Sequence, residues 1–260
     1  MHFLVFQHVR VEHPGIFRDF WKDAGVLWTS VELDEGEEIP HNLADYDALV
    51  VMGGPMDVWQ IEQHPWLVAE IAAIREFVVR LGRPFLGVCL GHQLLAEALG
   101  GHVGPGAEAE VGPCPVRLTG HREGDSLLQG LPSPLTTFQW HGAEVKTLPA
   151  DAVVLAETDI CPIQAFRWGP CAYGFQFHAE ITAETVDDWR RIPAYRESLE
   201  ATLGIGASER LALETLALLP QFSKTARLLN DRFLDVVRNW SGRQDSNLRP
   251  RGPEPRALPV

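Results

Sequence analysis

Short apolar runs alternate with helical patterns through the first half of the chain. The apolar runs predict buried strands, and they lie at 3–6, 26–33, 48–52 and 84–88. Between them, apolar residues three and four positions apart predict helices at 15–24 and 66–81. This order of strands and helices predicts an α/β fold, in which a mostly parallel sheet is flanked by helices.

The second half of the chain has a different pattern. Strand-like pieces separated by Gly and Pro lie at 116–118, 136–140, 152–156, 163–167 and 173–177. We expect these pieces to extend the sheet and to add β-hairpins. Apolar positions return to a helical spacing after residue 182 and predict a C-terminal helical segment.

The patterns divide the chain into three parts. Residues 1–190 form the expected α/β domain, and residues 191–240 a helical extension packed on it. Residues 241–260 are aperiodic, rich in Pro and locally basic, so they bury too little apolar area to offset their ordering entropy. We expect a disordered tail there.

The pentapeptide Gly87-Val88-Cys89-Leu90-Gly91 follows directly on a predicted strand. Gly-x-nucleophile-x-Gly builds a sharp turn between a strand and a helix, which exposes the central side chain above the end of the sheet. The following segment, 92–99, is predicted to be a helix closed by Gly100. Cys89 is therefore expected at a helix N-terminus, where the dipole favours a thiolate. The alternative is a small buried apolar cysteine.

Two further motifs supply what a thiolate nucleophile needs. In an extended strand, His178 and Glu180 lie on the same face, so the carboxylate can orient the imidazole toward Cys89. Gly53-Gly54-Pro55 ends a predicted buried strand and can turn a backbone N–H toward a ligand. Taken singly, each motif also has an ordinary structural interpretation: a solvated or satisfied pair, and a strand-ending turn.

Composition narrows the classes of function. The chain has 260 residues and a net charge of −13, which argues against nucleic-acid and anionic-membrane partners. Its four cysteines form no Cys-x-x-Cys and its ten histidines no His-Glu-x-x-His, so we expect no metal site. The N-terminal segment does not resemble a signal peptide, and no apolar run reaches membrane-spanning length. We expect a cytoplasmic protein.

Four motifs together resemble the class I (triad) glutamine amidotransferases. The resemblance covers about residues 4–189 and is closest to stand-alone members similar to the glutaminase domain of GMP synthase. The motifs are Gly53-Gly54-Pro55, Gly87-Val88-Cys89-Leu90-Gly91-His92-Gln93, Gln139-Trp140-His141-Gly142 and Gln176-Phe177-His178-Ala179-Glu180. The resemblance implies a flavodoxin-like sheet with extra hairpins near the site, and no cofactor. Many relatives carry Asp after the His-Gly pair, where this chain has Ala143.

The resemblance also implies a role for each matching residue. Cys89 is the expected nucleophile on the side-chain amide of glutamine, His178 the proton shuttle and Glu180 its orienting group. The backbone amides of Gly54 and Leu90 are the expected oxyanion hole. The expected substrate-binding residues are Gly53, Gln93 and His141.

The acceptor of the released ammonia is not encoded by these motifs. The residues after the catalytic region are too few for a synthetase domain, and the chain has no Gly-x-x-x-x-Gly-Lys-Ser/Thr phosphate loop. Three hypotheses remain. The chain supplies ammonia from glutamine to a separate synthetase partner, or it is a γ-glutamyl peptidase or hydrolase acting on conjugates, or it is a non-enzymatic sensor or binding protein that keeps the fold.

Overall fold

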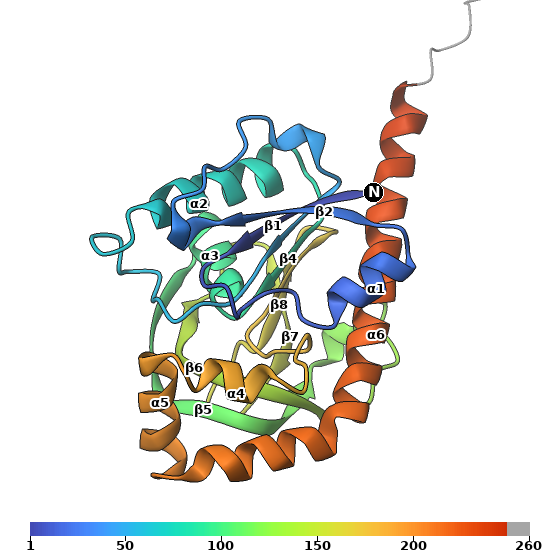
Figure 1. The fold of residues 1–260 in the computed structure, drawn as a ribbon. Coiled ribbons are helices and arrows are strands. Elements are labelled where there is room, and N and C mark those ends of the chain that lie inside the picture. Colours follow the sequence, from blue (N-terminus) through green and yellow to red (C-terminus); the bar gives the residue numbers. More distant parts are fainter. Residues whose placement is uncertain (249–260) are drawn as a thin grey trace, which may run out of the picture.

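The computed structural model describes residues 1–248, and a nine-stranded sheet forms their centre (Figure 1). The strands follow one another across the sheet in the order β2-β1-β3-β4-β9-β8-β7-β5-β6. Their bounds are β1 His2–Gln7, β2 Leu27–Glu32, β3 Ala48–Val51, β4 Phe85–Val88, β5 His102–Leu118, β6 Leu135–Thr147, β7 Ala152–Glu157, β8 Ala165–Trp168 and β9 Ala172–Phe175.

The sheet has a parallel half and an antiparallel half. Strands β2, β1, β3, β4 and β9 are parallel and have the flavodoxin-like order that was predicted. The other strands pair antiparallel, and β5 with β6 forms a long hairpin. Because the carboxyl ends of parallel strands share one edge, the segments that follow β1, β3, β4 and β9 meet there.

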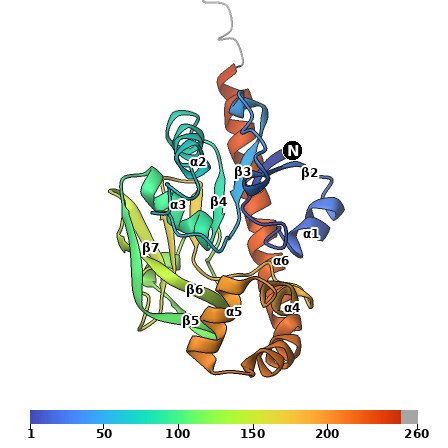
Figure 2. The ribbon, with the colours of Figure 1, turned by 60° about the vertical axis from the view of Figure 1, so that its left-hand side comes forward.

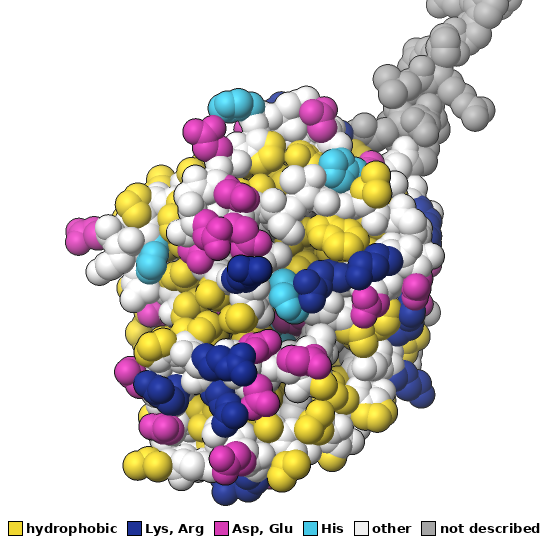
Figure 3. Space-filling model, in the orientation of Figure 1, with side chains coloured by type: hydrophobic (Ala, Val, Ile, Leu, Met, Phe, Trp, Pro, Cys, Tyr) yellow, Lys and Arg dark blue, Asp and Glu magenta, His cyan; other side chains and the backbone are white. Residues whose placement is uncertain are grey.

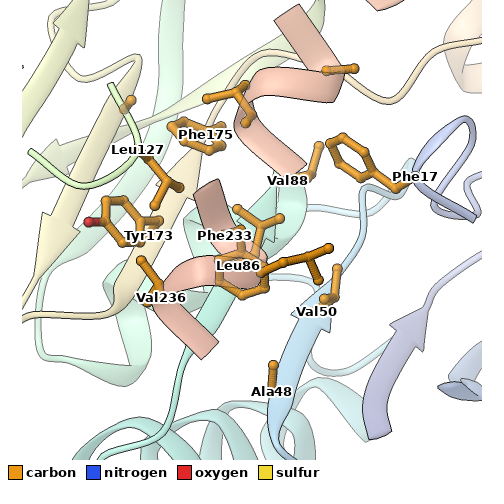
Figure 4. Close-up of a cluster of buried hydrophobic side chains, with 14 of the residues drawn as sticks. Phe17, Ala48, Val50, Leu86, Val88, Leu127, Tyr173, Phe175, Phe233 and Val236 are labelled. Carbon is orange, nitrogen blue, oxygen red and sulfur yellow. The ribbon is translucent and has the colours of Figure 1, made fainter. Parts of the chain in front are cut away.

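Helices cover both faces of the parallel half. Side chains alternate between the faces along each strand, so Phe3 and Val5 enter one core while Leu4 and Phe6 enter the other. The first core is closed by α1 and α6, and Figure 4 shows Phe233 of α6 among the strand side chains. The second core is closed by α2 and α3. The helices are α1 Phe17–Asp23, α2 Trp66–Arg75, continued by a π-helical turn at Glu76–Arg80, α3 Leu90–Ala98, α4 Thr185–Trp189, α5 Pro193–Leu203 and α6 Ala207–Leu248.

The C-terminal helices wrap around the antiparallel end and then the back of the sheet. A third core joins β6 to α4, α5 and the first part of α6. Helix α6 then bends sharply (Figures 1 and 2), and Pro220 inside it explains the bend, since proline cannot donate the backbone hydrogen bond of its turn.

Helix α6 also corrects one expectation about the tail. It continues to Leu248, so 241–248 are helical although they were predicted to be disordered. A helix that is already packed extends at low cost, because each further residue adds a hydrogen bond without a new nucleation step. The rest of the predicted tail, 249–260, lies outside the described residues.

Basic side chains gather over α4 and α5 (Figure 3), on a protein whose net charge is negative. Arg190 and Arg191 lie in this patch, and each pairs with an aspartate of α4, at 3.0 Å from Asp187 and 2.7 Å from Asp188. The positive charge of the patch is therefore partly neutralised. Of the helices in the described residues, none is both long and apolar enough to cross a membrane.

Candidate active site

Cys89 occupies a strained turn between β4 and α3. Its φ is 51° and its ψ −104°, a conformation that L-residues rarely adopt. The flanking glycines are required sterically, because a Cβ on Gly87 would lie 2.4 Å from the carbonyl oxygen of Gly91, and one on Gly91 would lie 2.1 Å from that of Val51. The backbone N–H of Cys89 donates to Phe175 in β9 at 2.8 Å. The local sequence therefore builds the predicted elbow.

His178 and Glu180 meet beside this turn, though not through strand geometry. β9 ends at Phe175, whereas the apolar pattern predicted a strand to 177, and His178 instead makes an isolated bridge to Phe138. The carboxylate of Glu180 accepts a 2.7 Å hydrogen bond from Nδ1 of His178. The indole of Trp189 meets the imidazole edge to face at 4.6 Å. Both side chains of the pair are buried, so the imidazole is held firmly in one orientation.

The thiol of Cys89 does not rest as the thiolate that its place at a helix N-terminus favoured. Burial raises its pKa well above the usual value, and the charges of Glu12 and Glu180 raise it further. The backbone N–H of Leu90 acts in the opposite direction but does not outweigh them. Sγ lies 3.6 Å from Nε2 of Gln176 and 4.0 Å from the carbonyl oxygen of Trp140. The thiol of Cys89 is therefore held in its protonated form, and its use as a nucleophile would require a base.

The glycine loop after β3 lies against this turn. The carbonyl oxygen of Gly53 accepts a hydrogen bond from Nδ1 of His8 at 2.8 Å. A Cβ on Gly54 would lie 2.9 Å from side-chain carbons of both His8 and Leu90. The expected oxyanion-hole residues, Gly54 and Leu90, are thus neighbours in space, although they lie 36 positions apart in the sequence.

A cavity of about 230 Å³ opens in front of Cys89. Predicted residues that line it are Gly54, Cys89, Leu90, Gln93 and His141, whereas Gly53, His178 and Glu180 do not. Helix α5 supplies another wall, which the motifs did not indicate, through Ala194, Tyr195 and Ser198. The C-terminal helices therefore help to shape the candidate site.

Gln93 and His141 converge on one backbone carbonyl. The amide of Gln93 donates to the carbonyl oxygen of Ala143 at 3.3 Å and to Oε1 of Gln176 at 3.1 Å. Nδ1 of His141 lies 3.0 Å from the same carbonyl oxygen. A backbone oxygen thus organises this wall at the position where many relatives carry Asp.

Behind that wall, His141 belongs to a buried polar group that could in principle hold a metal ion. Glu110, His141 and Cys161 each place one ligand atom within 4.8 Å of the others. Both oxygens of Glu110 already accept hydrogen bonds, from Thr158 at 3.0 Å and Gln164 at 2.6 Å. Burial raises the pKa of Glu110, but the hydrogen bond and charge of His141 outweigh this effect and lower it. The arrangement works as a hydrogen-bond network that fixes the His141 ring.

His92, from the same motif as Cys89, has a packing role. Its ring is buried against Phe166 at 5.0 Å, and a Cβ on Gly174 would lie 2.7 Å from its Nδ1. Burial lowers the pKa of His92 to about 3, so this imidazole is neutral. It fixes α3 against β9.

Glu12 is a further carboxyl group beside the site, and no motif in the sequence pointed to it. It follows β1 in a polar stretch, yet only 2% of its surface is exposed. Neither carboxylate oxygen has a hydrogen-bond partner among the described residues, and a Cβ on Gly53 would lie 1.9 Å from Oε2. Burial, with the charge of Glu180 added, raises the pKa of Glu12 well above 4.5. This carboxyl therefore holds its proton more tightly than an exposed glutamate does.

The buried state of Glu12 predicts a pH-dependent stability. A carboxyl whose pKa is raised on folding binds its proton more tightly in the folded protein, so stability falls as pH rises from about 4.5 through the folded pKa. Glu12→Gln cannot ionise and escapes this loss. We expect its melting temperature to exceed that of the wild type by about 2–4 °C or more at pH 8, and not at pH 4. The exposed Glu108→Gln serves as the control, and an equal pH dependence in all three proteins would contradict the assignment.

Comparison with known proteins agrees with this geometry. The sequence profile of the class I glutamine amidotransferases matches residues 20–188. A putative glutamine amidotransferase-like protein, YfeJ of Salmonella typhimurium, is 36% identical over 190 residues, which span 72% of this chain and 78% of that protein. One subunit of the glutamine-hydrolysing GMP synthase of Archaeoglobus fulgidus is 35% identical over 161 residues, spanning 62% of this chain and 79% of the relative.

Solved structures agree as well. The crystal structure of a glutamine amidotransferase from Thermotoga maritima superposes with a TM-score of 0.79 at 29% identity, covering 90% of this chain and 97% of that one. Residues 20–188, which match the family profile, contain β3, the elbow and the His178–Glu180 pair. The profile therefore covers the whole candidate site apart from the segment after β1 and the α5 wall. The chain belongs to the class I glutamine amidotransferase family and is an amide-hydrolysing enzyme.

Proposed function

We propose that this enzyme hydrolyses the side-chain amide of glutamine through a γ-glutamyl thioester on Cys89. The observation that carries the proposal is the strained elbow, which presents Cys89 to a cavity of about 230 Å³ beside the 2.7 Å pair of His178 and Glu180. A cysteine, an imidazole and an orienting carboxylate form the constellation that acyl transfer requires.

The proposed reaction has two acyl-transfer steps. His178 takes the thiol proton, Sγ of Cys89 bonds to the amide carbon, and the carbonyl electrons move to oxygen. That oxygen is stabilised by the backbone N–H groups of Gly54 and Leu90. Collapse breaks the C–N bond, and His178 gives its proton to the departing ammonia. Water, deprotonated by His178, then attacks the thioester and releases glutamate together with the Cys89 thiol.

Glu180 keeps Nδ1 of His178 protonated, so Nε2 is the nitrogen that exchanges protons. Gln93 and His141 line the cavity and would contact the amino-acid part of the substrate. Gly53 lies outside the lining residues, so its predicted contact with substrate becomes a supporting one, through the peptide bond it shares with Gly54.

The proposed substrate is glutamine and not a larger γ-glutamyl conjugate. A cavity of about 230 Å³ with Tyr195 of α5 in its wall supports this part of the proposal. We further propose that ammonia passes to a separate synthetase partner, as the name of the Archaeoglobus relative, a synthase subunit, suggests for that protein.

Residues 1–190 would be the amidotransferase domain and 191–240 its helical extension, since the family profile ends at 188. The free thiol of Cys89 suits a reducing cytoplasm.

Glutamate release by the purified chain tests the proposal. We expect turnover of glutamine that exceeds turnover of a panel of γ-glutamyl amides and dipeptides, and that disappears in Cys89→Ala. Preference for a conjugate would identify a γ-glutamyl peptidase instead. Silence on every substrate, together with no labelling of Cys89 by a glutamine-analogue electrophile, would overturn the proposed reaction at Cys89.

A further inference from the structure

A second His–Glu pair lies behind the glycine loop, outside the substrate cavity. His8 follows β1, and Glu70 belongs to α2, 62 positions later in the chain. Nε2 of His8 lies 2.8 Å from Oε1 of Glu70, and Nδ1 lies 2.8 Å from the carbonyl oxygen of Gly53. Both side chains are fully buried, and the His8 ring stacks on Trp66 at 5.5 Å. The pair therefore holds the loop through the Gly53 carbonyl, and neither side chain lines the cavity.

The partners of His8 determine where its protons lie. A backbone carbonyl can only accept a hydrogen bond, so Nδ1 must carry a proton to bind Gly53. Burial lowers the pKa of His8, but the charge and hydrogen bond of Glu70 and the Gly53 contact outweigh it, and the net pKa is raised. Glu70 thus favours a ring that donates from both nitrogens.

The carbonyl of Gly53 and the N–H of Gly54 belong to one peptide unit. This unit is planar and trans, so the two groups point in opposite directions. When His8 holds the carbonyl, the N–H of Gly54 points the opposite way, and Gly54 itself lines the cavity together with Leu90 and Cys89. One hydrogen bond therefore sets the direction of an oxyanion-hole donor.

Such a clamp acts on the Gly53–Gly54 peptide because no side chain on either residue restricts its rotation. Two consecutive glycines allow a peptide to rotate with little steric resistance. Glycine is nevertheless required, since a Cβ on either residue would collide with Glu12 or with His8 and Leu90. Stability alone does not account for the pair, because desolvation offsets most of the Coulombic gain of a buried ion pair.

We propose that His8, oriented by Glu70, is a positioning residue that fixes the Gly53–Gly54 peptide with its N–H toward the oxygen of the tetrahedral intermediate. The proposal rests on the proposed function, since it requires that an oxyanion forms at Cys89. It assigns His8 and Glu70 a role in kcat, although neither side chain lines the cavity.

Two substitutions of the same residue separate the two contacts of the ring. The amide nitrogen of His8→Asn can occupy the place of Nδ1 and keep the donor to Gly53 while losing Glu70. The longer His8→Gln reaches toward Glu70 and loses the donor to Gly53. We expect kcat to fall about 10²–10³-fold in His8→Gln, as for loss of an oxyanion donor, with a small change in KM. His8→Asn is expected to recover most of that loss, and the exposed His121→Gln to match the wild type.

The rate at which iodoacetamide alkylates Cys89 is the second measurement, because a general disturbance of the site would change this rate. This displacement at a saturated carbon forms no oxyanion, so its rate should be equal in the wild type and in His8→Gln. If His8→Gln does not fold, the apolar double variant His8→Leu/Glu70→Leu takes its place, because it removes the donor to Gly53 without leaving a buried carboxylate unpaired. It should also lose about 10²–10³-fold in kcat, with alkylation again unchanged.

The outcomes distinguish the two proposals. Equal kcat in the wild type and in the folded variant would overturn the role of His8 and leave the proposed function standing. A parallel loss of turnover and of alkylation would also overturn it, since the effect would then be on the thiol. A wild type that turns over neither glutamine nor a γ-glutamyl amide would overturn the proposed function itself.

Discussion

Cys89→Ser is expected to lower glutamine hydrolysis by about 10⁴-fold or more while the protein keeps its melting temperature. Serine is nearly isosteric with cysteine and tolerates the positive φ of residue 89 equally poorly, so the elbow itself should not change. The hydroxyl is far less acidic than the thiol, and the buried site already raises the pKa of the thiol. His178 would therefore have to remove a proton that it cannot hold. Glutamate release and thermal unfolding measure the two parts of the prediction.

A matched control comes from Cys171, which lies just before β9, at the edge of the sheet opposite the elbow. Its Sγ contacts the carbonyl oxygen of Gly82, a contact that a serine hydroxyl can also make. Cys171→Ser should therefore keep wild-type turnover. If Cys89→Ser retains turnover comparable to this control, the nucleophile lies elsewhere.

The elbow was predictable because the Gly-x-Cys-x-Gly spacing is itself local. Gly87 leaves room for the turn's own backbone, 2.4 Å from where a Cβ would stand, and Gly91 leaves room for the carbonyl oxygen of Val51 in β3, at 2.1 Å. The mostly parallel sheet was also predictable from apolar runs separated by helices, and the family resemblance supplied its flavodoxin-like strand order. Family resemblance then identified which side chains meet at the carboxyl ends.

Features that depend on contacts between distant segments could not be predicted from the sequence. His8 and Glu70 are 62 positions apart and carry no motif, and nothing in a polar stretch shows that Glu12 is buried. The predicted end of β9 was two residues too late. Phe177 is apolar because its side chain packs in the core, where its ring stacks on Phe175 at 5.1 Å, and not because it belongs to a strand. Burial is a property of the whole fold, so a local pattern cannot report it.

The thiolate expectation for Cys89 failed for the same physical reason. A helix N-terminus lowers the pKa of an exposed thiol, but full burial and two nearby carboxyl groups act in the opposite direction. Of the two carboxyl groups, Glu180 was expected beside Cys89, whereas only the fold brings Glu12 there. Since the thiol is protonated at rest, turnover depends on how well His178 is prepared to accept a proton.

Glu180→Gln is therefore expected to lower kcat by about 10²–10⁴-fold with little change in KM. The carboxylate can only accept a hydrogen bond from Nδ1 of His178, whereas an amide can also donate one and so stabilise the tautomer in which Nε2 carries the proton. That tautomer cannot deprotonate Cys89. KM should not change because Glu180 does not line the cavity.

The backbone of Glu180 makes this test specific. Its carbonyl oxygen accepts the N–H of Ile16 at 2.9 Å and thereby holds the segment after β1, and the substitution leaves that bond in place. Glu184→Gln, a neighbouring exposed carboxylate, provides the control and should behave as the wild type. A change confined to KM would show that Glu180 acts on substrate and not on His178. A loss of kcat with an unchanged melting temperature would place the effect at the imidazole, where the 2.7 Å hydrogen bond predicts it.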